Sequence, residues 1–316
     1  MSMMQMLLAT SSGGASSPLV VSTWTGNSST QSINTGQDLS TKKGFVWIKR
    51  YASSTDGAIF DNTSDRGANK RVQPHTSAQL LTLNGSLTSF DSTGYSLGSS
   101  SKVNASGIAT IGYSFVETPD VVDVVAYDGH PTGSPQNISH NLGVVPELMI
   151  IKSDDTRSWI VYHKDVGNGT AYRLDEASNG TGDNMFDNTT PTSSVFRVGV
   201  DSRTNQDGRP YVAYLFASKA GVCKIGSYTG NGSTNAINFG FQPAWVLIKR
   251  RTGSVDWVLV DNERGSDKFY RPNLVDAQTT QSGALTFTST GMTLNNTNTF
   301  VNQFGVDHIY MAFAAS

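Results

Sequence analysis

The residues with the clearest potential for chemistry are three lysines that each follow four apolar residues. They are Lys49 in "FVWIKR", Lys152 in "LMIIKS" and Lys249 in "WVLIKR". A recurring ammonium group at one position could bind an acidic ligand, such as an acidic glycan. The alternative is a solvated strand end, where a lysine discourages edge-to-edge pairing of strands. Because lysine is rarely buried, we expect these three side chains to be solvent-exposed strand ends.

A histidine and a carboxylate two residues apart, His163 and Asp165, are the nearest approach to an acid–base pair. No nucleophile accompanies them, and the matching stretches elsewhere read "DN", so we expect another surface strand end. The histidines show no metal-ligand spacing, and the spacing of the carboxylates singles out no pair for glycoside hydrolysis. The five histidines are His75, His130, His140, His163 and His308.

The remaining candidates for chemistry have structural explanations that we prefer. Cys223, the one cysteine, excludes an intrachain disulfide and is expected to be a small buried residue at a strand start. The stretch "NGTGDN" at 179–184 resembles a calcium-binding glycine repeat but occurs once, which favours a loop. No glycine-rich run has the Lys-Ser or Lys-Thr of a phosphate loop. The sequence therefore assigns no catalytic, cofactor-binding or metal-ligating residue, and it predicts a protein that is not an enzyme.

Five tryptophans offer flat apolar faces that could stack on sugars. Four of them lie inside apolar runs, where core packing is the natural use, and Trp24 beside a Thr-Gly turn is the best candidate for exposure. Tyr127 and Tyr228 take the place of Trp24 in similar stretches, so the aromatic residue is a property of the fold and we expect it in a core. The tryptophans are Trp24, Trp47, Trp159, Trp245 and Trp257.

The stretches that carry these residues recur three times in one order. Each copy opens on an aromatic residue before a turn, at Trp24, Tyr127 and Tyr228. The lysine-containing run follows, then a second apolar run, and finally an aromatic run that reads "IGYSF", "VAYLF" or "IYMAF". Several landmarks in one order, repeated about every hundred residues, indicate three tandem copies of one structural unit.

Each copy is predicted to be built from β-strands. Short apolar runs rich in Val, Ile, Trp, Tyr and Phe are separated by Gly, Asn, Asp, Ser and Thr. The run "VFRVGV" at 195–200 alternates, whereas "WVLIK" and "LMIIK" are apolar on both faces. Gly26, Gly129 and Gly230 are expected to take positive φ in turns. We predict an all-β chain of three tandem β-sandwich-like domains of about 100 residues, each with about seven or eight strands.

The overall charge excludes some classes of partner. Net charge is −2 and charged residues are 15% of the chain, so no electrostatic footprint for nucleic acid or an anionic membrane is visible. The longest apolar runs fall far short of the roughly 20 residues that span a bilayer. The opening "MSMMQMLLATSSGG" has no basic region, so we interpret it as a non-secretory segment. It is either a frayed terminus or a Met-rich arm that docks into a groove on a partner.

The "YTGNG", "WVLIKR…WVLVDN" and "IYMAF" landmarks resemble a tandem-repeat β domain of tailed bacteriophages that infect cyanobacteria and other marine bacteria. That domain occurs in virion and tail-fibre-like proteins. The resemblance covers almost the whole chain after about residue 20 and is looser in the first copy, where "GAIFDN" lacks a tryptophan. It implies a virion structural protein, assembled in the bacterial host cytoplasm. A tail fibre or similar appendage for host attachment is expected, with a capsid decoration or head-fibre protein as the alternative and a glycan-cleaving tail enzyme less favoured.

The expected organisation is an N-terminal virion-docking arm at 1–19 and repeats at 20–117, 118–218 and 219–316. The arm is expected to bind other virion subunits, and the repeats a host surface glycan or protein. Three separate cores would let Gly221–Ser316 fold alone. The second apolar face of the lysine-containing runs needs a neighbour, either another copy in the chain or the same copy in another chain. We predict a homotrimer held by apolar contact.

Overall fold

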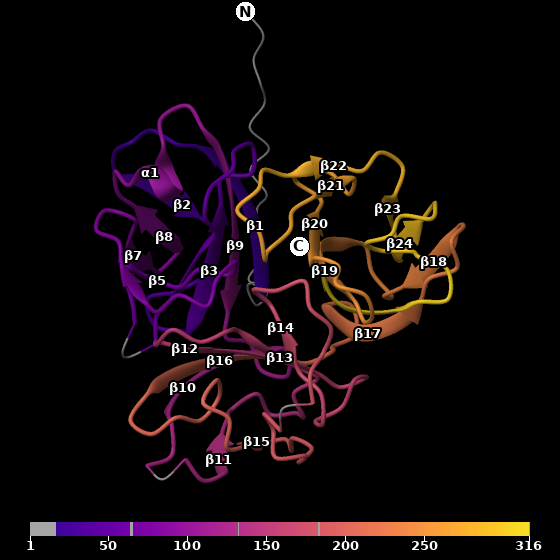
Figure 1. Cartoon of the computed structure of the whole chain (residues 1–316). Coiled ribbons are helices and arrows are strands. Elements are labelled where there is room, and N and C mark those ends of the chain that lie inside the picture. Colours follow the sequence, from indigo (N-terminus) through magenta and orange to yellow (C-terminus); the bar gives the residue numbers. More distant parts are fainter. Residues whose placement is uncertain (1–16, 64–65, 132, 183, 316) are drawn as a thin grey trace, which may run out of the picture.

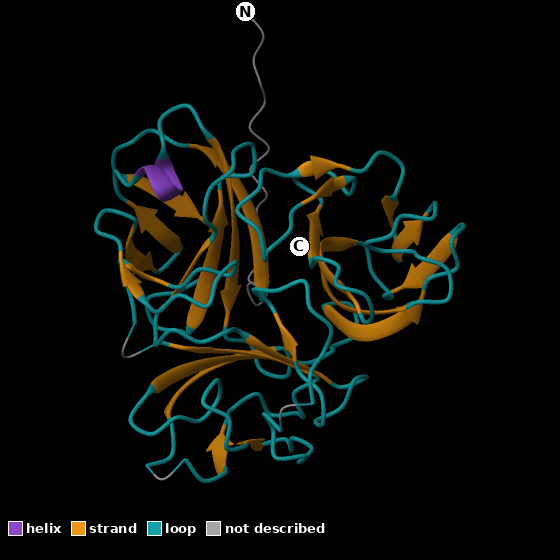
Figure 2. Ribbon diagram, viewed as in Figure 1, coloured by secondary structure: helices purple, strands orange, loops and turns teal. Residues whose placement is uncertain are grey.

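The chain folds into three lobes around a common centre (Figure 1). The structure is a computed structural model that describes residues 17–63, 66–131, 133–182 and 184–315. Strands and loops make up nearly all of it, and the described ranges contain one short helix, α1 (Ser101–Asn104) (Figure 2). Each lobe is one sequence repeat, which confirms the all-β class and the three tandem sandwich-like domains.

A larger antiparallel sheet in each lobe has the same spatial order of strands. The first strand of the repeat pairs with the last, the last with the lysine-containing strand, and that strand with its hairpin partner. In lobe 1 the order is β1 (Leu19–Thr25), β9 (Ala109–Val116), β3 (Gly44–Lys49) and β4 (Ala58–Asp61). In lobe 2 it is β10 (Val122–Asp128), β16 (Pro210–Phe216), β12 (Leu148–Ser153), β13 (Ile160–His163) and the added β14 (Tyr172–Arg173). In lobe 3 it is β17 (Cys223–Thr229), β25 (Asp307–Ala314), β19 (Pro243–Arg250) and β20 (Val258–Asp261).

A smaller sheet covers the outer face of each larger one. In lobe 1 it is β2 (Gln31–Asn34), β8 (Gly94–Leu97) and β7 (Leu87–Asp91). In lobe 2 it is β11 (Gln136–Ser139) and β15 (Val195–Val198), and in lobe 3 it is β18 (Asn235–Asn238), β24 (Gly291–Leu294) and β23 (Leu285–Thr288). Two-residue strands form ribbons in lobes 1 and 3: β5 (Lys70–Arg71) with β6 (Leu81–Thr82), and β21 (Lys268–Phe269) with β22 (Thr279–Thr280).

The lysine-containing strands are buried on both faces, as their apolar runs predict. In β3, Val46 and Ile48 pack inside lobe 1 against its smaller sheet, while Phe45 and Trp47 point to the centre of the molecule. Successive side chains of a strand alternate between faces, so one strand contributes to two cores. Strands β12 and β19 divide their side chains in the same way. Each lobe therefore has its own core, and all three share a central one.

Three equivalent phenylalanines mark the middle of the central core. Phe115, Phe216 and Phe313 each pair with the corresponding residue of β3, β12 or β19. Their ring centroids lie 5.9 Å, 5.5 Å and 6.2 Å apart, and all three pairs meet edge to face at 72° to 79°. Such geometry is favourable for aromatic rings. A cavity of about 10 Å³ remains among the surrounding side chains, so the packing is tight.

The shared core changes two expectations drawn from the sequence. The prediction of three separate cores is incomplete, because each lobe has its own core but the central faces of all three larger sheets also pack against one another. The apolar faces for which we proposed a second or third chain are covered by the other lobes of the same chain. The homotrimer stays a prediction, but its physical ground is gone, since this chain already closes a three-lobed arrangement by itself.

The glycines of the three opening turns serve a purpose other than the one predicted. Gly26, Gly129 and Gly230 do not take positive φ. Instead each lies so close to a neighbouring loop that an added Cβ would stand 1.9–2.3 Å from a backbone oxygen. A side chain of any kind would push the two loops apart, so the glycine is required by close approach of backbone to backbone.

Other details follow the sequence less closely. Strand β1 begins at Leu19, inside the range expected for the arm, and residues 1–16 lie outside the described residues. The alternating run at 195–200 is a strand with Phe196 and Val198 buried, but it ends there, and Val200 is exposed. Lobes 1, 2 and 3 contain nine, seven and nine strands within the described ranges, against the predicted seven or eight.

Candidate functional site: the seams between the lobes

The three lysines are fully buried, which contradicts the prediction of solvated strand ends. Side chains at every second position of a strand lie on the same face, so Lys49 lies on the face that carries Phe45 and Trp47. This is the central face of β3, where the lobes meet. Lys152 and Lys249 occupy the same position in β12 and β19. The apolar run before each lysine was correctly predicted to be buried on both faces. The error lay in assuming that the strand ended in water.

Backbone carbonyls hold each ammonium group. The Nζ atom of Lys49 donates to the oxygen of Thr55 in its own hairpin and, at 2.9 Å, to that of Val275 in lobe 3. Lys249 repeats this arrangement, since it donates to a carbonyl of its own hairpin and, at 2.9 Å, to Ala177 of lobe 2. Lys49 and Lys249 therefore join adjacent lobes. We call such inter-lobe contacts seams, each named by its two lobes.

Burial lowers the pKa of all three lysines. The pKa of Lys49 and of Lys249 falls to about 8, and that of Lys152 to about 7. Lys152 differs in its partners, because it donates at 2.6 Å and 2.9 Å to Ser153 and Asp155 of its own lobe. A neighbouring cation, Arg66 of lobe 1, adds to the lowering at Lys152. These amines are thus structural donors in a dry environment.

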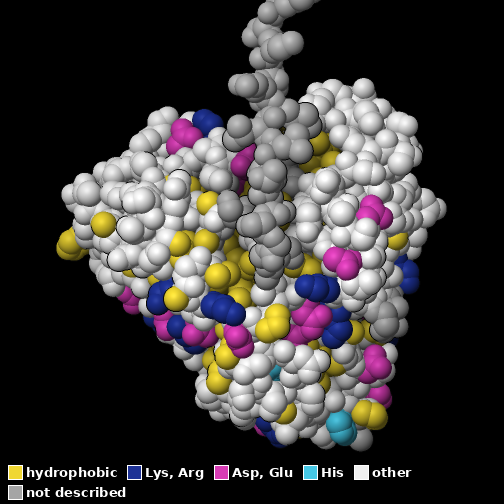
Figure 3. Space-filling model, turned by 180° about the vertical axis from the view of Figure 1, so that it is seen from behind, with side chains coloured by type: hydrophobic (Ala, Val, Ile, Leu, Met, Phe, Trp, Pro, Cys, Tyr) yellow, Lys and Arg dark blue, Asp and Glu magenta, His cyan; other side chains and the backbone are white. Residues whose placement is uncertain are grey.

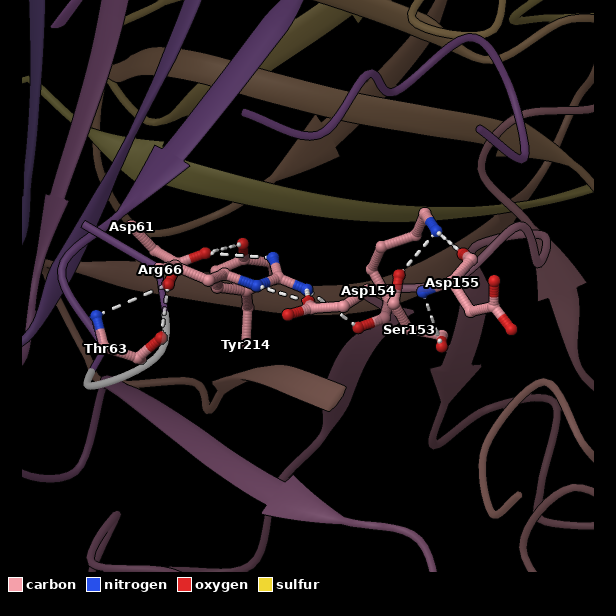
Figure 4. Close-up of polar contacts among 8 residues, drawn as sticks. Asp61, Thr63, Arg66, Ser153, Asp154, Asp155 and Tyr214 are labelled. Atoms are coloured by element: carbon pink, nitrogen blue, oxygen red, sulfur yellow. Dashed lines mark hydrogen bonds and ion pairs between the residues drawn. The ribbon is translucent and has the colours of Figure 1, made fainter. Parts of the chain in front are cut away.

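An aspartate, an arginine and a tyrosine meet in the 1–2 seam (Figure 4). The Nη1 atom of Arg66 lies 3.0 Å from Asp61, and the hydroxyl of Tyr214, from lobe 2, donates to the same carboxylate at 2.8 Å. Arg66 also crosses the seam to Asp154 and to the carbonyl of Lys152, at 2.8 Å and 3.1 Å. Because every strong donor has an acceptor, this buried ion pair carries no uncompensated charge.

The 3–1 seam repeats this triad. Arg264 pairs with Asp261, and Tyr113 of lobe 1 donates to Asp261 at 2.8 Å. The side chains of Arg264 and Asp261 are 1% and 0% exposed, so the pair is entirely removed from water. Strand register shows that Asp261 corresponds to Asp61, because each faces the first aromatic residue of its lysine-containing strand.

The 2–3 seam replaces all three members of the triad. His163 stands at the aspartate position, Val166 in place of the arginine, and Met311 in place of the tyrosine. His163 is fully buried, which corrects its prediction as a surface residue, and its Nε2 atom lies 3.4 Å from the carbonyl of Tyr310 in lobe 3. Burial lowers the pKa of His163 to about 4, so the ring is neutral at pH 7. The 2–3 seam thus has an uncharged contact where the other two seams have a charged network.

A fourth set of equivalent residues was missed from the sequence. Asn104, Asn205 and Asn302 are 0–1% exposed, and each binds the opening turn of its own lobe. The side-chain oxygen of each accepts from the turn backbone at 2.7–3.0 Å, and the side-chain nitrogen donates to two carbonyls. The signal was present in the endings "SKVN", "SRTN" and "TFVN", but an asparagine in a polar stretch does not stand out.

The predictions for the cysteine and for the five tryptophans are confirmed. Cys223 is buried at the first position of β17, and burial raises the pKa of its thiol. All five tryptophans are buried, including Trp24, whose Nε1 atom donates to the carbonyl of Val103. Across the described ranges, no three His, Cys, Asp or Glu side chains gather as a metal site would require. No helix within those ranges has the length and apolar character of a membrane span.

The two linkers between repeats and both described chain ends meet at one place. Pro18, Val121, Val222 and Ala314 line a largely apolar hollow of about 260 Å³. Corresponding bonds join the start and the end of each lobe there: the nitrogen atoms of Val116, Ala217 and Ala314 donate to the carbonyls of Pro18, Val121 and Val222. In the view from behind, apolar side chains gather where the lobes meet (Figure 3). Hairpin turns and opening turns lie at the other end of the same strands.

A polar groove also opens in the 2–3 seam. It has a volume of about 420 Å³, and Tyr172, Asn179, Arg251 and Asp307 are among its lining residues. Arg251 and Asp307 lie 3.6 Å apart and are 32% and 52% exposed, so they are solvated and contribute little to stability. The corresponding groove of the 1–2 seam has a volume of about 280 Å³ and contains Asp154, Asp155 and Arg209.

Comparison with known proteins gives a family but no activity. No curated protein and no solved structure matches the chain. A family model described as a domain of unknown function, DUF7483, matches residues 15–316, which takes in all three lobes as one unit. That extent agrees with a shared core, because no lobe is complete without its neighbours. The chain belongs to the DUF7483 family.

Proposed function

We propose that this protein is a structural component of a bacteriophage virion, a tail fibre or similar appendage that takes part in host attachment. The repeat landmarks that resemble phage tail-fibre-like domains are the first support. The buried groups with strongly lowered pKa values are the second, because Lys49, Lys152, Lys249 and His163 all hold strand ends or seams together. These contacts suit a structural role in a rigid body, since structural ion-pair networks also perturb pKa values.

The observation that carries the proposal is that the linkers and the loops lie at opposite ends of the sheet strands. Linkers and the root of the arm, at Ser17, lie at one end of the sheet strands. The three lysine hairpins and the three opening turns lie at the other end. A body with its attachment segment at one end and three sets of loops at the other suits an appendage that is anchored to a particle and presents loops to a host glycan or protein.

A decoration or head-fibre protein of the capsid is the second candidate. The observation that favours it is the approximate threefold arrangement of the lobes in one chain (Figure 1). A three-lobed body can sit on a threefold position of a particle and contact three equivalent neighbours. In either case residues 1–12 are proposed to bind another virion subunit.

One image distinguishes the two candidates. The protein carries a small tag after Ala315 and is located on particles by gold labelling and electron microscopy. Label at the tail tip or fibres supports the appendage, and label over the head supports the decoration protein. A particle population without label, from cells that make the tagged protein, would contradict both.

The arm is tested separately by deletion of residues 1–12. We expect particles to lose the protein while the purified variant keeps the circular dichroism and melting temperature of the full chain. Unchanged incorporation would rule out the docking role and leave the location on the particle to be explained by other surfaces.

A further inference from the structure

A backbone hydrogen bond closes the edge of two of the three seams. In the 1–2 seam the nitrogen of Leu80 donates to the carbonyl of Asp154 at 2.8 Å. In the 3–1 seam the nitrogen of Gln278 donates to the carbonyl of Tyr51 at 2.8 Å. In both seams the donor stands directly before β6 or β22, and the acceptor stands two residues after the buried lysine of the neighbouring lobe. The two bonds are therefore equivalent.

The 2–3 seam lacks this bond. Thr181 pairs with Ala171 as the first residues of β6 and β22 pair with β5 and β21, so Gly180 takes the donor position. Arg251 stands two residues after the buried lysine of lobe 3 and takes the acceptor position. The structure describes both residues, but no hydrogen bond joins them. The carbonyl of Arg251 accepts instead from the hydroxyl of Tyr172 at 3.2 Å, and the edge of the seam is open.

The polar groove of about 420 Å³ occupies this opening. Gly180 lines it and has no side chain to fill it, whereas Leu80 lines the smaller groove of about 280 Å³ in the 1–2 seam. Thr170, Asn179 and Thr252 also line the larger groove, and their side chains make no hydrogen bond with other described residues. Hydroxyl and amide groups on the groove wall are thus available to a ligand.

An exposed aromatic side chain stands beside the groove. Phe304 is 78% exposed and directly precedes Gly305, which lines the groove. Counted from the buried asparagine of each lobe, the corresponding residues are Ser106 and Asp207, so lobe 3 differs from the others in having an aromatic ring here. A single exposed apolar residue is common on protein surfaces. This one adds an apolar surface next to a polar groove.

The groove favours a neutral ligand that is rich in hydroxyl groups. Its volume lies in the range of small-molecule sites. Arg251 and Asp307 lie 3.6 Å apart in its wall and offset each other's charge, so neither an anion nor a cation is strongly attracted. Amide and hydroxyl groups donate and accept hydrogen bonds, as sugar hydroxyls do, and an aromatic ring offers a flat apolar face to a sugar ring.

We infer that the 2–3 seam binds a neutral glycan in this groove, with Phe304 in contact with a sugar ring. The inference rests on the proposed function, because it assigns the contact with a host glycan to one of the three seams. It also separates the seams by role, since the 1–2 and 3–1 seams are closed by the bond that the 2–3 seam lacks.

Binding is tested with the purified full chain. The labelled protein is applied to an array of bacterial capsular and O-chain saccharides, and the neutral saccharide that it binds best is then titrated by isothermal calorimetry. We expect a neutral saccharide to bind, with an affinity that changes less than about twofold between roughly 50 and 500 mM sodium chloride. Salt has little effect on an uncharged ligand because no ion pair is screened.

Variants of the groove are compared with a matched variant of the 1–2 seam. Asn179→Ala should weaken binding about 3–10-fold, as expected for loss of one hydrogen bond. Gln79 is the corresponding residue of the 1–2 seam and is exposed like Asn179, so Gln79→Ala should leave the affinity unchanged. Phe304→Ser, which introduces the residue found in lobe 1, should weaken binding about 3–10-fold. All three side chains are exposed, so the variants should keep the melting temperature of the full chain.

Three results would overturn the inference. They are an array on which no neutral saccharide binds, binding confined to acidic saccharides and lost as salt rises, and an affinity that Asn179→Ala and Phe304→Ser leave unchanged. Binding by the purified chain does not depend on where the chain lies on a particle. A negative array therefore contradicts the glycan site alone, whereas particles without label contradict the proposed function alone.

Discussion

The hydroxyl of Tyr214 donates a 2.8 Å hydrogen bond to the carboxylate of Asp61, across the boundary between lobes 2 and 1. Tyr113 and Asp261 form the same bond between lobes 1 and 3. Between lobes 2 and 3 the corresponding residues are His163 and Met311, which lack such a bond. One chain therefore contains two chemically different solutions to the same packing problem, and each can serve as a control for the other.

The apolar solution should be transferable to a charged seam. Arg264→Val alone leaves the buried Asp261 unpaired and should cost about 3–5 kcal/mol of the free energy of unfolding. Adding Asp261→His and Tyr113→Met recreates the 2–3 seam and should recover at least half of that loss. Denaturant unfolding of the single and triple variants measures both. A triple variant less stable than Arg264→Val would show that the two seams are not interchangeable.

Burial of Lys152 makes stability depend on pH. Its pKa is about 7 in the folded protein and near 10.4 in the unfolded chain, so the unfolded chain binds more protons between these values. The contribution of Lys152 to the free energy of unfolding should therefore rise with pH across this window, on the order of 2–4 kcal/mol. Denaturant unfolding from pH 7 to 9.5 should give a steeper rise for the wild type than for Lys152→Met. Parallel curves would contradict the buried charge.

The isolated third repeat should not fold cooperatively. A fragment from Gly221 to Ala315 exposes Trp245, Leu247 and Phe313, which the intact chain buries in the central core. Loss of several large core contacts exceeds the few kcal/mol by which a domain of this size is stable. Thermal melting followed by circular dichroism should show a broad transition. A sharp, two-state melt would restore the view of three independent domains.

The order of the repeats should be changeable. Linkers of four residues connect Val116 to Val121 and Ala217 to Val222. Ala314 and Pro18 occupy the equivalent positions, so a linker of the same length should connect them. A permuted chain can therefore run from Gly221 to Ala314, through Ser-Lys-Ala-Gly, and from Pro18 to Ser218. It should keep the fold, with a melting temperature within a few degrees of the original, since no described contact outside the linkers is altered. An insoluble or unfolded product would indicate that the chain ends are not equivalent to the linkers.

The sequence predicted the strands and repeats but could not predict their closure. The sequence showed that the lysine-containing runs are apolar on both faces, because the pattern of apolar residues along a strand is local. The sequence does not show what covers the second face of these strands. Another lobe of the same chain and a second chain would both fit the same pattern of apolar residues. The structure shows the intrachain arrangement, because residues from all three lobes form the central core.

The buried polar residues were the hardest to predict for a related reason. Lys49 and His163 are residue types that usually lie in water, and each has a hydrogen-bond partner in a segment distant in sequence, Val275 for Lys49 and Tyr310 for His163. Burial of such groups depends on partners that no local pattern reveals. The tryptophans and Cys223 were placed correctly because their own chemistry favours a core.

The replacement of Asp, Arg and Tyr by His163, Val166 and Met311 in one seam has a consequence for the history of the fold. In an assembly of three identical subunits every substitution appears three times, so a change that suits one interface is imposed on all. Fusing three copies into a single polypeptide removes that constraint, and each boundary can accumulate its own compensating mutations. The surfaces beside those boundaries can then differ as well, so one molecule can present three non-identical surfaces on a framework with three equivalent positions.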